Sequence, residues 1–275
     1  MNDILLIGPY IGDWKNEILT FRPYAKWVYD QLNIKNTECF ISSHFNRKFL
    51  YDWIPEENFI PVFEQLTRDE IGQHNYMHKS ICIKDYKLLV KEFKQKIIKL
   101  RKVSIRNIKI YNLSYLESTP HYSWYQKIFT KINVEPLYND YIIYIPDMSI
   151  DVDTNNKIFN NLQSEYENLV MVGDNNCHGI DDCINFQIDY SETGYRNLVR
   201  YILGCKFVIT PCSHWTFLCN LHHIPVISWG TNGNIYKRNN EFGFDNPMNY
   251  ILIDNDINKL ISSIKYFNRK IDGGL

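Results

Sequence analysis

The sequence predicts an α/β protein made of two Rossmann-like domains, each built on a parallel sheet. The chain has 275 residues, which suits two compact domains. Short apolar segments alternate with stretches in which apolar residues recur at helical spacing, a pattern typical of parallel sheets covered on both faces. This alternation restarts near Asn139, so we expect a domain over 1–137 and another over 138–275.

The first half opens with the apolar segment DILLIG, which a Gly-Pro pair ends. Further segments rich in apolar and β-branched residues follow, and amphipathic stretches separate them. The expected strands are 3–8, 38–44, 58–63 and 107–116, and the expected helices are 14–32, a basic helix before 107 and 123–132.

The second half repeats the pattern with a longer series of strands. Its distinctive part is FVITPCSHWTFLCNLHHIPVISWG, in which an apolar run, a turn and a short helical stretch lead into a second apolar run ending at Gly230. The expected strands are 141–146, 168–173, 183–188, 207–210, 226–230 and 250–253, and the expected helices are 157–166, 191–203, 215–221 and 257–267.

Composition excludes several classes of protein. The chain is 45% hydrophobic and 22% charged, with no apolar run of the roughly 18 residues that a membrane span needs. No signal peptide is visible, and seven cysteines without a regular framework favour reduced thiols. We therefore expect a cytoplasmic protein, in the host cytoplasm if the chain is viral. A single alanine, Ala25, beside abundant Ile, Asn, Lys and Tyr indicates an AT-rich genome such as that of a bacteriophage.

Charge is distributed unevenly along the chain. The formal charge is +5 for residues 1–135 and −6 for residues 136–275, and the segment 79–109 holds 11 basic residues against two acidic ones. A solvated amphipathic helix is one explanation, and a binding site for a polyanion such as nucleic acid, anionic lipid or a phosphorylated glycan is the other. The candidate acceptor-binding residues are Lys87, Lys91, Lys94, Arg101 and Arg106.

The turn between the strand at 207–210 and the following helix is a candidate phosphate site. Ser213 is a candidate N-cap, and the free N–H groups around Ser213, His214 and Trp215 would attract an anion together with the helix dipole. The alternative is structural, with Ser213 capping the helix and Trp215 packing in the core.

These residues resemble the heptosyltransferase-like glycosyltransferases of the GT-B class. The resemblance covers most of the second half and the first strand with its Gly-Asp turn. The chain departs from the family's Asp-Ser-Gly-Pro-Met-His at 212–217, where it reads Cys-Ser-His-Trp-Thr-Phe. The positions in register are Gly12, Asp13, Thr193, Gly194, Leu198, Pro211, Ser213, Leu218, Pro225, Val226 and Gly230.

The resemblance implies a GT-B fold with two domains facing across a cleft, the nucleotide sugar on the second half and the acceptor on the first. It also implies catalysis without a metal. Asp13 is then the expected base that takes the acceptor proton, with Glu17 in reserve, although Asp13 could instead cap a helix. The expected donor-binding residues are Thr193, Gly194, Ser213, His214, Trp215, Lys237 and Arg238, the last two supplying positive charge for the leaving diphosphate.

Other motifs support competing chemistry less well. The Asp-Val-Asp at 151–153 would suit a divalent metal in a different glycosyltransferase class. His74 and His78 have helical metal-pair spacing without a third ligand, and no C-x2-C pair, P-loop or G-x-G-x-x-G motif occurs.

The resulting hypothesis is a metal-independent hexosyl- or pentosyltransferase whose only co-substrate is a nucleotide sugar, expected to be a UDP-sugar. Its acceptor is expected to be anionic, and the AT-rich composition together with the missing membrane segment slightly favours duplex DNA with a hydroxymethylated base, as in phage DNA modification. The alternatives are a phosphorylated glycan or lipid-linked saccharide as acceptor, and a non-catalytic nucleotide- or nucleic-acid-binding protein on the same fold.

Overall fold

The computed structural model divides the chain into two compact units. Unit 1 comprises Met1–Asn133 with Tyr190–Thr193, and unit 2 comprises Val134–Asp189 with Gly194–Leu275. The boundary lies close to the expected one at 137/138. The residues that the structure describes are 4–10, 17–32, 37–61, 83–111, 131–146, 150–173, 185–187, 192–211, 214–230, 246–254 and 256–273.

Unit 1 is built on a parallel sheet of four strands in the order β3-β2-β1-β4. Each strand corresponds to one of the apolar segments expected from the sequence. The register aligns Ile4 of β1 with Glu38 of β2 and with Ile108 of β4. The strands are β1 (Ile4–Ile7), β2 (Glu38–Ser43), β3 (Phe59–Pro61) and β4 (Ile108–Tyr111).

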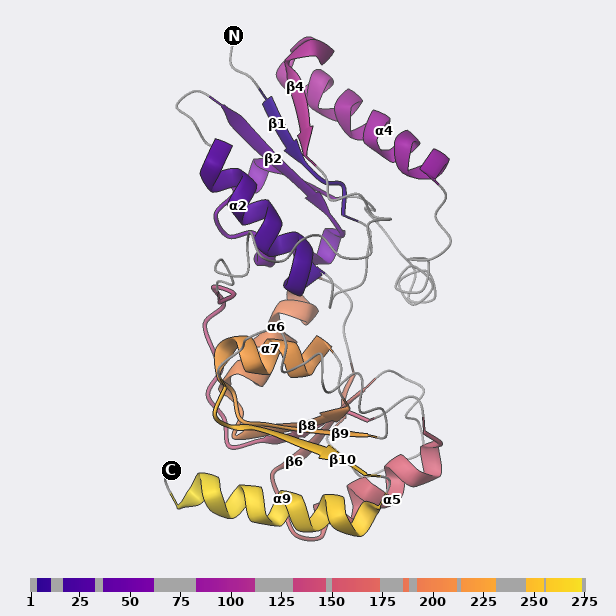
Figure 1. Ribbon diagram of the computed structural model, residues 1–275, viewed down its shortest axis with the longest axis vertical. Coiled ribbons are helices and arrows are strands. Elements are labelled where there is room, and N and C mark those ends of the chain that lie inside the picture. Colours follow the sequence, from indigo (N-terminus) through magenta and orange to yellow (C-terminus); the bar gives the residue numbers. More distant parts are fainter. Residues whose placement is uncertain are drawn as a thin grey trace. The chain divides into compact units, whose positions relative to one another are not determined.

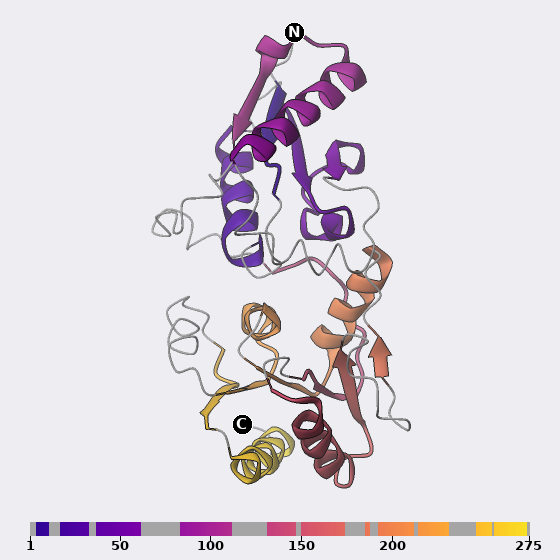
Figure 2. The ribbon, with the colours of Figure 1, turned by 90° about the vertical axis from the view of Figure 1, so that its right-hand side faces the viewer.

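Helices cover both faces of the unit 1 sheet, α2 (Arg22–Leu32) on one and α4 (Ile83–Arg101) on the other (Figure 1; Figure 2). Phe93 and Ile97 of α4 pack in a buried cluster with Leu6, Phe40 and other strand residues. Successive side chains of a strand point to opposite faces. The buried strand residues that alternate with those facing α4 therefore point toward α2. Shorter turns are η1 (Glu17–Phe21), η2 (Phe45–Leu50), η3 (Glu56–Asn58) and η5 (Ile105–Asn107).

Unit 2 is built on a parallel sheet of six strands in the order β10-β9-β8-β5-β6-β7. Counted from β5, this is the doubly wound order 3-2-1-4-5-6, in which the order of the parallel strands reverses between β5 and β8. The expected Rossmann-like topology is thus confirmed. The strands are β5 (Ile142–Tyr144), β6 (Leu169–Gly173), β7 (Asn185–Gln187), β8 (Phe207–Pro211), β9 (Val226–Gly230) and β10 (Asn249–Ile253).

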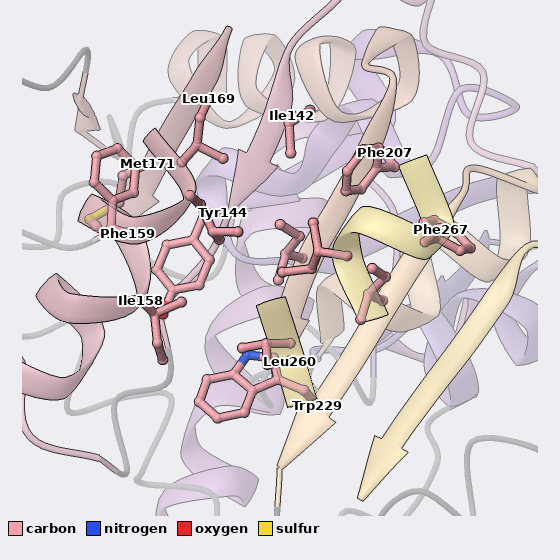
Figure 3. Packing of buried hydrophobic residues seen from close by; sticks show 14 residues of the cluster. Ile142, Tyr144, Ile158, Phe159, Leu169, Met171, Phe207, Trp229, Leu260 and Phe267 are labelled. Carbon is pink, nitrogen blue, oxygen red and sulfur yellow. The ribbon is translucent and has the colours of Figure 1, made fainter. Parts of the chain in front are cut away.

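In unit 2, α5 (Val152–Gln163) and α9 (Ile257–Asp272) lie on one face of the sheet, and α6 (Glu192–Gly204) and α7 (His214–His222) on the other (Figure 1). A cluster of buried hydrophobic residues fills the core between the sheet, α5 and α9 (Figure 3), where the hydroxyl of Tyr144 donates to the buried side-chain oxygen of Asn155 over 2.8 Å. Phe207 of β8 meets Phe267 of α9 edge to face, with ring centroids 5.6 Å apart. None of the helices in the described ranges combines the length and apolar character needed to cross a membrane.

Candidate functional site

The carboxyl edge of the unit 2 sheet has the strands and the helix expected from residues 207–230. In doubly wound sheets, ligands bind at this edge, beside the point where the strand order reverses. Here that point is flanked by the ends of β5 and β8, and α7 begins at His214, three residues after β8 ends at Pro211. The start of a helix attracts anions through its N–H groups and its dipole, and α7 starts at this edge of the sheet.

Two buried hydroxyl groups, those of Thr216 and Ser228, fasten the first turn of α7 to the sheet. The hydroxyl of Thr216 donates to the carbonyl of Pro211 over 3.2 Å, and the hydroxyl of Ser228 on β9 donates to Thr216 over 3.0 Å. Thr210 also donates to the Pro211 carbonyl, over 3.1 Å. All three side chains are fully buried. Sequence analysis did not identify these hydroxyl residues as a group. Their signal in the sequence is that each is a Ser or Thr inside an apolar segment.

Trp215 packs inside unit 2. Its side chain is only 3% exposed, and its ring stacks on that of Tyr195 with centroids 6.4 Å apart. Tyr195 follows Thr193 and Gly194 in the first turn of α6. The contact therefore brings the starts of α6 and α7 together, which places three of the expected donor-binding residues in one neighbourhood, with Trp215 as a packing residue.

The Asp-Val-Asp motif forms the start of α5. The carboxylate of Asp151 accepts hydrogen bonds from the backbone N–H of Thr154 over 2.8 Å and from its hydroxyl over 2.7 Å. These bonds from Thr154 lower the pKa of Asp151. Asp151 is thus an N-cap, and Asp153 lies exposed in the first turn of the helix. Within the described ranges, no group of three or more His, Cys, Asp or Glu residues is placed to hold a metal ion.

In unit 1, the chain after β1 passes between the ends of its two neighbouring strands. Gly8 N–H donates to the carbonyl of Tyr111 at the end of β4, and Tyr10 N–H donates to the carbonyl of Ser42 in β2, both over 2.9 Å. Gly8 has a φ of +108°, and a Cβ there would lie 2.5 Å from the Ser42 carbonyl oxygen. Glycine is required at this position. The segment leads toward Gly12 and Asp13, which lie outside the described residues.

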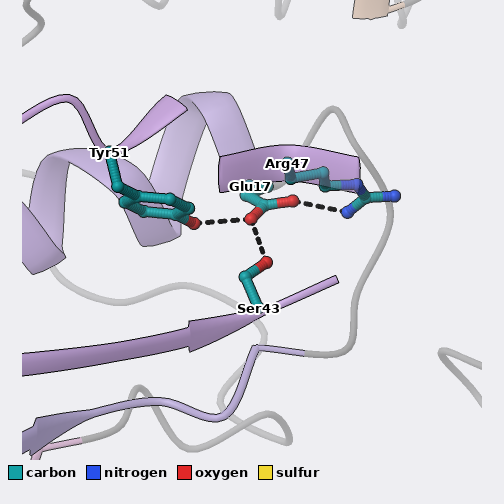
Figure 4. A network of polar contacts seen from close by, with 4 residues as sticks. All are labelled: Glu17, Ser43, Arg47 and Tyr51. Carbon is teal, nitrogen blue, oxygen red and sulfur yellow. Dashed lines mark hydrogen bonds and ion pairs between the residues drawn. The ribbon is translucent and has the colours of Figure 1, made fainter. Parts of the chain in front are cut away.

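Glu17 lies in a buried polar network (Figure 4). Its carboxylate is fully buried, pairs with Arg47 Nη1 at 2.5 Å and accepts hydrogen bonds from the hydroxyls of Ser43 and Tyr51, the latter at 2.5 Å. Burial, and after it the charge of Glu17, raises the pKa of Tyr51 well above its usual value, so this phenol stays protonated and donates. Both carboxylate oxygens are occupied, which fits a structural role better than the reserve base role.

Arg22 is a second buried cation in unit 1. Its Nε donates to the carbonyl of Leu50 over 2.7 Å, and its Nη2 donates to the carbonyl of Lys131 over 3.1 Å. The guanidinium also lies 5.1 Å from the ring centroid of Trp53. Burial lowers the pKa of Arg22 to about 10, which leaves it charged at neutral pH. Arg22 therefore ties η2 and the segment at 131 to the start of α2.

The basic helix α4 divides into two parts. Arg101, in its last turn, pairs with Glu38 at 2.6 Å and donates to the side-chain oxygen of Asn58 over 3.0 Å. Because Glu38 begins β2, this end of α4 lies at the amino edge of the sheet, opposite the edge where ligands bind. Arg106, just before β4, lies at the same amino edge. The geometry thus corrects the expectation that Arg101 is available to an acceptor.

The other acceptor-binding candidates lie earlier in α4. Lys87 and Lys91 are exposed in the first half of the helix, and Lys94, just past its midpoint, is half-buried. Four candidates from sequence analysis, as well as two histidines weighed as a metal pair, lie outside the described residues: Asp13, Ser213, Lys237 and Arg238, with His74 and His78. For His214 the structure describes the backbone position alone.

No protein-family model matches the sequence, and no curated protein matches it. Solved structures share its fold at low sequence identity. They include E. coli ADP-heptose lps heptosyltransferase II, at 12% identity and a TM-score of 0.54, with 99% of this chain and 100% of that chain covered. E. coli heptosyltransferase WaaC with ADP aligns at 10% identity and a TM-score of 0.52, covering 96% and 99%.

A third similar structure is a Listeria monocytogenes protein assigned as a UDP-N-acetylglucosamine 2-epimerase, at 9% identity and a TM-score of 0.52, covering 98% of this chain and 88% of that chain. At these identities the similarity shows the fold. It confirms two Rossmann-like domains of the kind found in GT-B proteins, and it bears out, for the fold, the resemblance to heptosyltransferases.

Proposed function

We propose that this protein is a glycosyltransferase that moves a sugar from a nucleotide-sugar donor to a hydroxyl of an anionic acceptor. One observation carries the proposal: the start of α7 at the strand-order reversal of unit 2, fastened by the buried hydroxyls of Thr216 and Ser228. A helix start held rigidly at this place suits a diphosphate. Support comes from a fold shared with two heptosyltransferases, one of them solved with ADP.

The proposed donor site is formed by the first turns of α6 and α7. N–H groups at Ser213, His214 and Trp215 would bind the diphosphate, while Thr193 and Gly194 approach the nucleotide. Lys237 and Arg238 remain the proposed cations that balance the charge of the departing diphosphate. With these groups in place no metal is needed, and a UDP-sugar is the proposed donor.

Asp13 is the proposed base. It follows the Gly8 segment at the carboxyl edge of the unit 1 sheet, and its carboxylate would take the acceptor proton as the hydroxyl attacks the anomeric carbon. Glu17, whose oxygens are already engaged by Ser43, Arg47 and Tyr51, is better suited to hold the start of η1 in position.

The proposed acceptor contacts are Lys87, Lys91 and Lys94. Positive charge on the acceptor domain suits either duplex DNA with a hydroxymethylated base, which the composition favours slightly, or a phosphorylated glycan, which the fold similarity to heptosyltransferases favours. For DNA, the modified nucleobase would have to leave the stack to bring its hydroxyl to the Asp13 carboxylate.

One experiment separates these possibilities. The protein is incubated with a mixture of nucleotide sugars and duplex DNA with or without 5-hydroxymethylcytosine, and in parallel with a phosphorylated glycan. Nucleotide release and the masses of products are measured. A sugar mass on the modified nucleoside supports the DNA acceptor, and a sugar mass on the glycan supports the other.

Variants test the assignments. Asp13→Asn should abolish transfer and keep nucleotide binding, while Asp153→Asn, an exposed carboxylate on α5, and added EDTA should leave the rate unchanged. Conversion of UDP-N-acetylglucosamine to an isomer without any acceptor would instead favour an epimerase, a chemistry assigned to the Listeria protein of the same fold. Nucleotide binding without turnover would favour a non-catalytic binding protein.

A further inference from the structure

The carboxy-terminal end of α4 carries a surface patch that the proposed transfer reaction does not use. We call it the α4-end patch, and it consists of five exposed residues: Lys99, Leu100, Lys102, Ile105 and Arg106. Leu100 and Ile105 are each 54% exposed, which is unusual for large aliphatic side chains so close together in the sequence. They belong to the last turn of α4 and to η5, both at the amino edge of the unit 1 sheet.

Along the sequence, the charge next to this patch is entirely positive. No acidic residue occurs between Phe93 and Leu116. The acids that the fold brings to this edge are largely neutralised, because Glu38 pairs with Arg101 and Glu56 pairs with Lys48. Among the described residues, three exposed cations therefore lie beside two exposed aliphatic side chains, with Glu57 as a nearby counter-charge.

This combination distinguishes between two polyanionic partners. Protein surfaces that bind single-stranded nucleic acid pair cations with aromatic rings that stack on bases. A nucleic acid offers little contact to isolated aliphatic side chains. An anionic bilayer attracts the cations at its headgroups and takes the aliphatic side chains into the boundary of the acyl layer. Neither signal alone gives firm attachment, whereas an apolar anchor and a basic patch together do.

We propose that the α4-end patch docks unit 1 on a lipid surface that contains anionic lipids. Lys99, Lys102 and Arg106 contact the headgroups, and Leu100 and Ile105 enter the boundary beneath them. The inference does not rest on the proposed function, because the patch lies at the edge opposite the ligand-binding edge and docking requires no nucleotide.

The test is co-sedimentation of the full chain with vesicles of phosphatidylcholine, with and without phosphatidylglycerol, in the absence of nucleotide. We expect binding only to vesicles with phosphatidylglycerol, and binding that weakens as salt is added. The triple variant Lys99→Gln/Lys102→Gln/Arg106→Gln should lose about a hundredfold in partitioning. The double variant Leu100→Ser/Ile105→Ser should lose about tenfold.

Matched controls remove the same kinds of group from unit 2. Lys157→Gln/Lys270→Gln takes away exposed positive charge, and Ile253→Ser takes away an aliphatic side chain that is 53% exposed. Both should bind vesicles like the unchanged protein, and circular dichroism confirms the fold of every variant.

Three outcomes overturn the proposal. One is the absence of vesicle binding, and another is equal loss in patch and control variants. The third is binding of unmodified duplex DNA that the triple variant loses while vesicles are ignored, which would assign the patch to nucleic acid.

Discussion

At the scale of single residues, the fold of unit 1 depends on charges buried beneath its surface. Glu17 and Arg47 are 0% and 3% exposed, and Arg22 is 2% exposed. A buried pair gives little net stability compared with apolar residues of the same size, but the removal of one partner leaves an uncompensated charge in the interior. Replacing one partner of the Glu17–Arg47 pair should therefore destabilise the fold far more than replacing both partners with apolar residues.

The first prediction concerns Glu17→Gln, which keeps the shape of the side chain and removes its charge. Arg47 then remains charged and buried, so the free energy of unfolding should fall by about 3–5 kcal/mol. Denaturant unfolding measures the change. The exposed pair of Lys26 and Asp30 is the control, and Asp30→Asn should cost about 0.5 kcal/mol or less. Equal stability of Glu17→Gln and the unchanged protein would show that the network contributes nothing.

The second prediction concerns the pH dependence that Tyr51 adds. Its pKa lies above the ordinary value of 10.0 in the folded state, so at higher pH the unfolded chain loses this proton first and unfolding becomes more favourable. The stability lent by Tyr51 is present below pH 10 and declines above it. Tyr51→Phe should show a smaller loss of stability between about pH 9 and about pH 11. Arg22 changes stability in the opposite sense, and because Tyr51 is one of the charges that raise its pKa, Arg22→Gln in both backgrounds is the control.

At the scale of elements, short polar contacts at helix ends decide where each helix points. Thr216 and Ser228 fix the start of α7, Asp151 caps α5, and Arg101 ties the end of α4 to β2. The contacts of α7 and α4 join residues that are distant in sequence, whereas the Asp151 cap lies within a single turn. Apolar periodicity produces the helices, and these contacts set their direction.

The third prediction is that Thr216→Val weakens both the fold and nucleotide binding. The substitution keeps the size of the side chain but removes the hydrogen bond to the Pro211 carbonyl, at a cost of about 1–2 kcal/mol in stability. If α7 holds the diphosphate, affinity for nucleoside diphosphates should also fall about fivefold. Calorimetric titration measures this, with Ser262→Ala on the other face of the sheet as control. A loss of stability with unchanged affinity would separate the hydroxyl set from the donor site.

The fourth prediction is that Arg101→Gln affects stability rather than transfer. It removes the pair with Glu38 and the hydrogen bond to Asn58, and because the pair is partly exposed the expected cost is about 1 kcal/mol. Added salt should shrink the difference. Lys99→Gln, two residues earlier and exposed, should leave thermal unfolding unchanged. A specific loss of acceptor binding in Arg101→Gln would return this residue to the acceptor site.

At the scale of the whole molecule, the two units have separate cores. The six strands of unit 2 and the buried cluster around Phe207 and Phe267 come from the part of the chain that begins at Val134, of which Tyr190–Thr193 belongs to unit 1. The four strands of unit 1 and the cluster around Phe40 and Phe93 come from the part before it. Each unit therefore has what a folding domain needs.

The fifth prediction follows from this division. A fragment of residues 134–275 should fold by itself, unfold cooperatively on heating, and bind nucleoside diphosphates if the donor site lies wholly within unit 2. Circular dichroism and calorimetric titration test the two parts separately. A fragment without a cooperative transition would show that unit 2 needs unit 1 to fold.

The sequence predicted the strands well because each is an apolar run ended by Gly, Pro or a polar cluster. It did not predict the strand order, which depends on pairing between distant segments. The same limit explains the missed networks: Glu17, Ser43, Arg47 and Tyr51 come from three separate elements. The Asp151 cap was local and visible, yet spacing alone could not distinguish a cap from a metal ligand. Asp13 remains a prediction, since it lies outside the described residues.

The close approach of Gly8 to β2 limits how this protein can evolve. In a library that carries every amino acid at position 8, glycine alone should survive selection for folding, because any side chain would collide with the Ser42 carbonyl. Changes in substrate specificity therefore have to arise at other positions, in the loops that follow. Descendants of this chain would still share glycine at position 8 long after their acceptors had diverged.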